Sequence, residues 1–330
     1  MKTTRRNIVG LAAAMAASMH LPLGHAQAGW TAKKPIQLLV PGQAGGNSDI
    51  LARLIANAIG NGLGQPIVID NKPGASGTLA SGLLSKSAPD GHCLLAASSD
   101  THTIYPQFFI NPNFHPEGHV PVAIISFVPF ALAARRDLEV ENLSDFVALA
   151  KSKQLSYSTW GIGTTGQAAM MLFMRAAGIK DMLHVPFTGS APAIQALMAG
   201  QVDAMMGAIP LISSSRSQLK PMAVMSKSRS PALSDIPTLE ESGLVIHETK
   251  EFWVGIMAPP NTPADIVNAS AAQIQKAMEV PSVKARIQEL GAIPQFVGPE
   301  DFRKVIGNEF AQWERITREA GVKRQDLKAG

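Results

Sequence analysis

Cysteine, aromatic residues and long apolar stretches are all scarce in this 330-residue sequence. Its single cysteine, Cys93, excludes an internal disulfide bond and a metal site built from a cysteine cluster. The two histidines that stand four residues apart, His115 and His119, are separated by a proline and a glycine, which argue against a shared helical face. No Gly-x-Ser-x-Gly motif is present. The sequence therefore predicts neither a metal site nor a hydrolase.

Positive charge is also scarce once the N-terminal segment is set aside. Residues 1–28 hold three cations and no acids, so the formal net charge falls from +4 to +1 (4 − 3) without them. A nearly neutral chain offers no basic surface for nucleic acid. The segment itself has a basic start, an apolar Ala-rich centre and small residues near its end, which is typical of a secretory signal peptide. We predict export by the Sec or the twin-arginine route.

The rest of the chain alternates short apolar strands with amphipathic helices, and this pattern occurs twice. "PIQLLV" leads through "PGQAGGNSD" into a helix, and "LSYST" leads through "WGIGTTG" into another. Such alternation indicates parallel strands covered by helices on both faces. We predict two α/β lobes with a cleft between them. Lobe 1 would comprise residues 29–126 and 253–330, lobe 2 would comprise residues 127–252, and apolar segments would cross between them.

Each lobe is predicted to begin with a glycine turn between a strand and a helix. The free N–H groups at a helix N-terminus attract an anion, and glycine lets the backbone approach it closely. Either turn could equally be an ordinary tight connection. The candidate residues in the two turns are Gly45, Gly46 and Asp49, and then Trp160, Gly161, Gly163, Thr164, Thr165 and Gly166.

The second turn also has the Gly-x-Gly-x-x-Gly spacing of a dinucleotide site. Asp181 stands near the distance expected for the acid that binds the ribose, but it precedes the next strand instead of following it. An enzyme that uses a nucleotide is therefore the less favoured hypothesis. Ser98, in Ser98-Ser99-Asp100, follows a strand at the edge where open α/β sheets place ligands. This short segment could contact a ligand or cap the next element.

Several long segments together resemble the substrate-binding receptors of tripartite tricarboxylate transporters, the Bug-type periplasmic binding proteins. The similarity runs from about residue 35 to residue 321 and includes "KPIQLLVPGQAGGNSDILARLIANAIGNGLGQPIVIDNKPGASG", "HVPFTGSAPAIQALMAGQVDAMM" and "FWVGIMAPPNTP". It implies a type II periplasmic-binding-protein (Venus flytrap) fold with mixed, mostly parallel sheets. It also implies a monomeric periplasmic receptor without cofactor or enzymatic activity. Such a receptor delivers a small carboxylate to membrane permease subunits.

The resemblance assigns roles to the candidate residues. Gly45, Gly46 and Asp49 match the first-lobe turn, which often meets the far end of the ligand through water. The second-lobe turn, whose amides and hydroxyls would hold the carboxylate, and the next loop around the pocket are matched by Gly161, Gly163, Thr164, Thr165, Thr188 and Gly189.

Three departures from the family pattern bear on the ligand. The aromatic and proline residues of the family's first turn are replaced by residues 42–44, Gly-Gln-Ala; Trp160 replaces a small residue; and Gly166-Gln167 replaces Ser-His. An aromatic ring in the cleft would stack on a planar ligand. We therefore predict an aromatic dicarboxylate, with terephthalate as the leading candidate. The alternatives are that Trp160 packs within lobe 2 and the ligand is an aliphatic carboxylate such as citrate or succinate, or that the protein is a sensory receptor.

Overall fold

The computed structural model describes residues 30–45, 47–110, 114–248 and 251–326. The predicted signal peptide and Gly46 lie outside these ranges. Within them, no helix combines the length and the apolar character that a bilayer crossing requires.

The order of elements follows the alternation predicted from the sequence. The strands are β1 (Ile36–Val40), β2 (Ile67–Asn71), β3 (Cys93–Ser98), β4 (Phe109–Ile110), β5 (Val120–Arg135), β6 (Ser156–Thr159), β7 (Leu183–Pro186), β8 (Ala204–Ala208), β9 (Leu219–Met225), β10 (Glu251–Ala258), β11 (Ile293–Val297) and β12 (Gln325–Asp326). The helices are α2 (Asn47–Leu63), α3 (Thr78–Ser85), α4 (Leu143–Ser152), α5 (Thr165–Ala177), α6 (Ser190–Met198), α7 (Ile209–Ser214), α8 (Ala264–Glu279), α9 (Pro281–Glu289) and α10 (Pro299–Glu319). Short helical turns are η1 (Ala75–Gly77), η2 (Asp100–Ile104, π-helical), η3 (Tyr105–Gln107), η4 (Pro116–Gly118), η5 (Arg216–Gln218) and η6 (Pro231–Leu233).

The strands form a mixed sheet in the order β2-β1-β3-β10-β5-β8-β6-β7, with β9 and β11 also paired to β5. Pairing is parallel at the two ends, where β1 lies between β2 and β3 and β6 lies between β7 and β8. Pairing along β5 and β10 is antiparallel. The predicted mixed α/β fold is confirmed, and its central part is more antiparallel than the sequence indicated.

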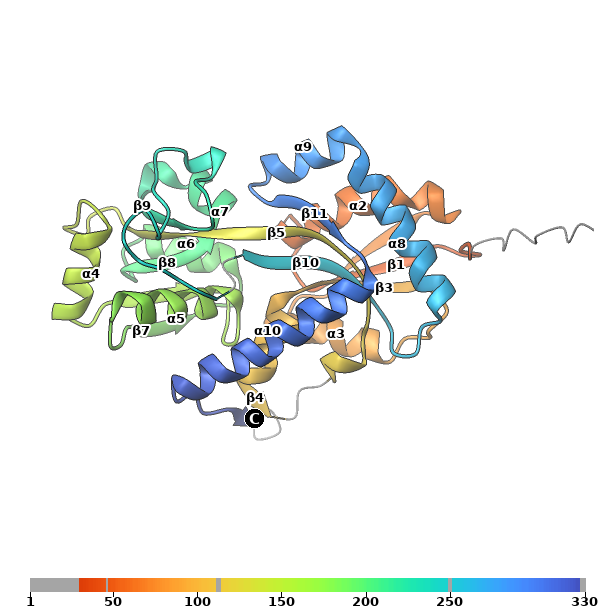
Figure 1. Ribbon diagram of the computed structural model, residues 1–330, viewed down its shortest axis with the longest axis horizontal. Helices are drawn as coiled ribbons and strands as arrows, with labels where there is room; N and C mark the ends of the chain where they lie inside the picture. The colour runs from red at the N-terminus through yellow and green to blue at the C-terminus, as the bar shows by residue number, and fades with distance from the viewer. Residues whose placement is uncertain (1–29, 46, 111–113, 249–250, 327–330) are drawn as a thin grey trace, which may run out of the picture.

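The long strand β5 connects the two halves of the molecule. Its first part, up to Pro129, pairs with β10, and from Phe130 onward it pairs with β8 and β9. Figure 1 shows β1, β3, α2 and α8 on one side, β7–β9 and α4–α7 on the other, and β5 and β10 running between them. We use lobe 1 and lobe 2 for these two groups. The lobe boundaries predicted at residues 126/127 and 252/253 remain predictions. The point at which β5 changes its pairing from β10 to β8 and β9, between Pro129 and Phe130, lies three residues beyond the first boundary.

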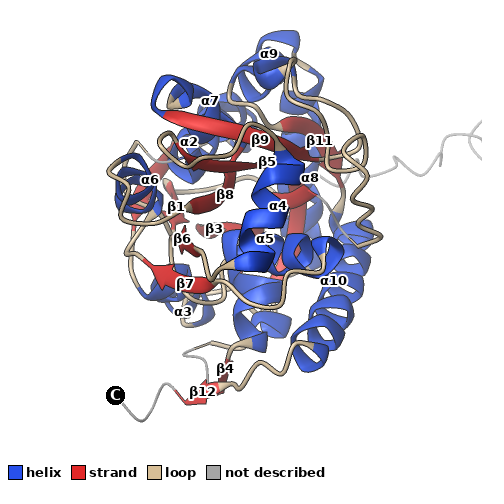
Figure 2. Ribbon diagram, turned by 90° about the vertical axis from the view of Figure 1, so that its left-hand side faces the viewer, coloured by secondary structure: helices blue, strands red, loops and turns tan. Residues whose placement is uncertain are grey.

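Helices enclose the strands, as Figure 2 shows, while β4 and β12 pair with each other apart from the main sheet. The C-terminal helices return to lobe 1, where α8 packs on α2 and β5 and α10 packs on β5 and η2. The aromatic side chains of Phe302 and Trp313 in α10 are fully buried. Helix α10 therefore supports η2 from behind.

Candidate ligand-binding site

The first-lobe turn, between β1 and α2, is organised by Asp49. This side chain is 2% exposed and accepts hydrogen bonds from the Gly45 N–H, from Arg53 Nε and from Asn71 Nδ2, each at 2.9 Å. Burial alone would raise the pKa of Asp49, but the hydrogen bonds from Arg53, Gly45 and Asn71 outweigh it, so the pKa is lowered. The carboxylate therefore holds the turn in shape, and its negative charge is balanced by these hydrogen-bond donors.

The second-lobe turn, residues 160–164, connects β6 to α5 through two glycines with positive φ. Gly161 has φ +147° and Gly163 has φ +71°, which side chains rarely permit. The Gly163 N–H donates to Gln167 Oε1 at 2.8 Å, and Thr164 Oγ1 donates to the Gly161 carbonyl at 2.9 Å. Both Thr164 and Thr165 are buried. The turn is thus a compact cap over the start of α5.

This turn lies directly against lobe 1. Ser76 Oγ of η1 donates to the Ile162 carbonyl at 3.3 Å. A Cβ atom on Gly161 would stand 2.6 Å from Ser76 Oγ, and one on Gly163 would stand 3.2 Å from the Tyr105 Cα. The structure therefore brings the predicted second-lobe residues onto η1 and η3 of lobe 1, with the lobes closed on each other.

Asp100, the first residue of η2, carries the main polar contact between the lobes. One carboxylate oxygen accepts a hydrogen bond from the Thr165 N–H, and the other accepts from Trp160 Nε1 at 3.4 Å. Burial raises the pKa of Asp100, and the hydrogen bonds from Thr165 and Trp160 offset this only in part. The Thr165 N–H lies at the α5 N-terminus, where a carboxylate is favoured. The anion held there is the protein's own side chain.

The sequence predicts Ser98 as a site residue and gives Asp100 no role of its own. In the structure Ser98 ends β3 and is partly buried, and its carbonyl accepts from Thr101 Oγ1 at 3.4 Å. The neighbouring Ser99 Oγ accepts from the Trp253 N–H at 3.1 Å and so fixes η2 to β10. The position of Asp100 directly after the end of a strand was the one signal in the sequence that could have pointed to it. Its partner across the cleft, Thr165, is 65 residues further along the chain.

Behind η2 lies a buried chain of two histidines. Thr101 Oγ1 is 2.8 Å from His102 Nδ1, His102 Nε2 is 2.9 Å from His119 Nδ1, and His119 Nε2 is 2.8 Å from Ser85 Oγ. Burial lowers the pKa of His102 well below its ordinary value and lowers that of His119 to about 4. These histidines are therefore neutral structural groups at neutral pH. Sequence spacing gave no sign that they meet.

A buried acid of α10 holds η2 from another side. Glu309 Oε2 accepts from Thr103 Oγ1 at 3.0 Å and from Trp253 Nε1 at 2.9 Å. Burial raises the pKa of Glu309 to about 7, although these hydrogen bonds act in the opposite direction. Together with the histidine chain, Glu309 fixes the backbone that presents Asp100 to lobe 2.

Residues 51–322 match the sequence model of a protein family, the tripartite tricarboxylate transporter family receptors. The chain belongs to this family. BugT of Bordetella pertussis is 30% identical over 303 residues, which are 88% of this chain and 90% of BugT. A protein encoded in the tcbD-tcbE intergenic region of Pseudomonas sp. strain P51 is 30% identical over 292 residues, 86% of this chain and 85% of that protein.

Solved structures similar to this receptor confirm the two-lobe periplasmic-binding-protein fold. A structure of a R. palustris protein with adipate superposes with a TM-score of 0.83 at 30% identity, covering 89% of this chain and 99% of the other. MatC of Rhodopseudomonas palustris with bound malate gives 0.78 at 32% identity, covering 86% and 99%. The periplasmic binding protein BugD gives 0.81 at 29% identity, covering 89% and 100%. These are substrate-binding proteins, so the comparisons give the nucleotide-using enzyme no support.

In this receptor Thr188 and Gly189 lie in the loop after β7. Because β7 runs parallel to β6, this loop leaves the sheet at the same edge as the second-lobe turn. Gly189 has φ +137° and precedes α6, and Thr188 is exposed. The loop therefore borders the turn without being covered by lobe 1 as Thr164 and Thr165 are.

Trp160 and Gly166, two of the departures from the family pattern, are linked in the receptor's structure. A Cβ atom on Gly166 would stand 2.6 Å from the Trp160 ring, so the ring lies directly over the first turn of α5. The ring also meets Phe130 of β5 edge-to-face, with centroids 5.7 Å apart. The large ring at position 160 can thus take this place only because residue 166 is a glycine and has no side chain.

We expect Gly166→Ala to destabilise the receptor by about 1–3 kcal/mol, because the added methyl group forces the Trp160 ring out of place. In a Trp160→Ala background the same change should be neutral or slightly stabilising, since alanine favours a helix over glycine by up to about 1 kcal/mol. Urea unfolding of the four proteins measures this coupling. An equal cost of Gly166→Ala in both backgrounds would contradict the contact.

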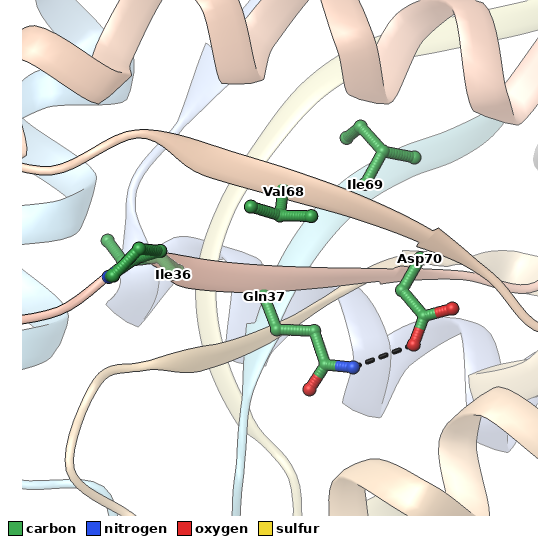
Figure 3. A pocket seen from close by; sticks show the side chains of 6 residues that line it. Ile36, Gln37, Val68, Ile69 and Asp70 are labelled. Carbon is green, nitrogen blue, oxygen red and sulfur yellow. Dashed lines mark hydrogen bonds between the residues drawn. The ribbon is translucent and has the colours of Figure 1, made fainter.

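A shallow depression elsewhere in the described residues is not part of this site. It is lined by residues from the start of β1 and from the edge strand β2, and Gln37 Nε2 donates to Asp70 Oδ2 within it at 2.7 Å (Figure 3). Strand β2 lies at one end of the strand order, whereas β6 and the second-lobe turn lie near the other. The depression therefore opens on the outside of lobe 1.

Proposed function

We propose that this receptor captures a small carboxylate in the periplasm by lobe closure and delivers it, as a monomer, to the permease subunits of a tripartite tricarboxylate transporter. The observation that carries the proposal is the carboxylate of Asp100 bound at the α5 N-terminus between the lobes. It supports the view that this N–H group is an anion site. Two similar structures contain the dicarboxylates malate and adipate, which supports the same class of ligand.

In the proposed complex, one carboxylate of the ligand accepts a hydrogen bond from the Thr165 N–H at the α5 N-terminus, and the other end of the ligand faces the first-lobe turn. The groups assigned to the two ends are Gly45, Gly46, Asp49 and Ser98 in lobe 1, and Trp160, Gly161, Gly163, Thr164, Thr165, Gly166, Thr188 and Gly189 in lobe 2. Closure removes water from the cleft, so each N–H bond to the carboxylate becomes stronger. No cationic side chain is needed, because the amides and the helix dipole supply the positive potential.

Within this class we propose an aromatic dicarboxylate, with terephthalate as the leading candidate. Trp160 lies beside the Thr165 N–H, and its neighbour Phe130 stacks on Phe252 with ring centroids 5.0 Å apart. Phe130 and Phe252 are themselves buried, so the half-buried Trp160 ring is the aromatic face proposed to meet the ligand, where a planar ring would gain about 0.5–1.5 kcal/mol beyond area burial. An aliphatic dicarboxylate such as adipate is the competing ligand.

Thermal unfolding of the mature protein against a panel of compounds tests the proposal. The panel contains terephthalate, benzoate, adipate, malate, citrate, succinate, NAD and ATP. A ligand present at 100 times its Kd should stabilise the fold by about 2.7 kcal/mol, which is a clear shift in Tm. Stabilisation by dicarboxylates supports the receptor function, and stabilisation by NAD or ATP alone would overturn it.

We expect Trp160→Ala to weaken terephthalate binding about tenfold or more and to change adipate binding much less. The physical reason is that loss of the ring removes stacking as well as apolar contact, and only the aromatic ligand depends on stacking. Isothermal titration of both ligands measures the difference. Trp30→Phe is the matched control, because Trp30 contacts His92 in lobe 1 and takes no part in the turn. Equal losses for terephthalate and adipate would remove the argument for an aromatic ligand.

A further inference from the structure

The position of Asp100 conflicts with the simplest picture of ligand binding. Its carboxylate already accepts from the Thr165 N–H, which is the donor proposed for the ligand. The second oxygen accepts from Trp160 Nε1, so the ring expected to contact the ligand is engaged as well. Two carboxylates that share this one N–H would bring their oxygens into contact, with like charges facing each other. The ligand and Asp100 therefore exclude each other at this point.

The charges around Asp100 sharpen this conflict. Within the described part of the chain, the hydrogen-bond partners of the carboxylate are the N–H and the hydroxyl of Thr165 and the Nε1–H of Trp160, and no lysine or arginine forms an ion pair with it. A ligand carboxylate entering beside an ionised Asp100 would meet a like charge in a closed, poorly solvated space, which is strongly unfavourable. The side chain must leave the α5 N-terminus before a ligand carboxylate can settle there.

The backbone that carries Asp100 is held firmly within lobe 1. The remainder of η2 is fixed by Thr101 and His102 to the histidine chain and by Thr103 to Glu309. While the lobes stay closed, release of the carboxylate is therefore a rotation of the Asp100 side chain about its own bonds; when the lobes open, Asp100 moves away from α5 together with lobe 1. Because the side chain stays tethered beside the site, it competes with the ligand at a high effective concentration.

We propose that Asp100 is a built-in competitor of the ligand: its carboxylate joins the lobes at the α5 N-terminus, and a ligand carboxylate binds there only by displacing it. The inference rests on the proposed function. It makes Asp100 a specificity-determining residue, because a monocarboxylate has only one end with which to displace the tethered group. A dicarboxylate has a second end for the first-lobe turn, and that contact tips the competition in its favour.

Asp100→Asn tests the competition. The amide has nearly the shape of the carboxylate but no charge. Its NH2 group is a donor and cannot accept the hydrogen bond from Trp160 Nε1. Isothermal titration should show that the variant binds terephthalate or adipate at least about tenfold more tightly than wild type. Binding of benzoate, a single carboxylate, should rise by a similar factor or more. Asp265→Asn, which removes an exposed acid from the first turn of α8, is the control and should change neither affinity.

A second measurement needs no ligand. If Asp100 joins the lobes, the radius of gyration from small-angle scattering should be larger for Asp100→Asn than for wild type and Asp265→Asn. An unchanged radius overturns the joining role, and unchanged or weaker carboxylate binding overturns the competition. If no carboxylate binds either protein while the radius still increases, the proposed function fails and the contact between the lobes stands. Asp100→Ser serves as a second uncharged variant should the asparagine protein fold poorly.

Discussion

Replacing Gly163 with alanine should prevent tight closure of the lobes while leaving each lobe folded. The residue has φ +71°, and its added Cβ atom would stand 3.2 Å from the Tyr105 Cα and 3.4 Å from the Phe108 side chain, both in lobe 1. The Tyr105 backbone cannot yield as a flexible side chain can. Overpacking of this kind costs about 1–3 kcal/mol, so we expect ligand affinity to fall about 10- to 100-fold.

Gly200→Ala is a matched control for the backbone strain of this variant. Gly200 has φ +72°, and no atom lies within 4 Å of the position that its Cβ would take. Both variants should lose about 1 kcal/mol of folding stability, because alanine is strained at positive φ. Only Gly163→Ala should lose affinity in titrations with the dicarboxylate that stabilises wild type most. If both variants bind alike, the turn does not close against lobe 1 as described.

Glu309 should make the folding stability of the receptor depend on pH in an unusual direction. Its pKa rises from an ordinary value near 4.5 to about 7 on folding, so the folded state binds the extra proton between these values. Its contribution is fully present below pH 4.5 and is lost as the pH rises through 7. The change amounts to about 3 kcal/mol at 1.36 kcal/mol per pKa unit. Glu309→Gln should abolish it.

The buried histidines act in the opposite sense and must be separated from this effect. The folded state lowers the pKa of His102, and that of His119 to about 4, so their contribution to stability is present above pH 6.5 and is lost as the pH falls toward 4. The useful quantity is therefore the difference in unfolding free energy between Glu309→Gln and wild type, measured in urea from pH 4.5 to 8. It should grow with pH. Glu314→Gln, exposed on the same helix, should give no such trend.

Local patterns predicted much of the fold. "WGIGTTG" followed by an apolar helix predicted the turn of residues 160–164 and α5, which is capped at its C-terminus by Gly178 with φ +64°. The short strands β4, β11 and β12 were missed, since each is too brief or too irregular to give a period. Confirmed elements are those whose hydrophobic spacing is set within one stretch of chain.

The site was less predictable, because its contacts join residues that are distant in the sequence. The glycine turns were recognisable in the sequence. That Asp100 accepts from the Thr165 N–H, and that Trp160 needs a glycine at position 166, follow only from the packed structure. The link between His102 and His119 likewise needs η2 and the start of β5 to meet. Sequence spacing indicates which backbone can bind an anion. It does not indicate which carboxylate reaches it first.

The continuity of β5 determines what lobe opening costs. One strand is hydrogen-bonded to β10 up to Pro129 and to β8 and β9 from Phe130, so each half of the ladder belongs wholly to one lobe. Pro129, the last residue of β5 in register with β10, has no N–H and so donates no ladder hydrogen bond where the partners change. A bend between Pro129 and Phe130 would leave the strand pairs on either side of it within their own lobes. The energy that separates open from closed receptor is therefore confined to a few contacts facing the cleft, and single substitutions there can reset the balance between the two forms.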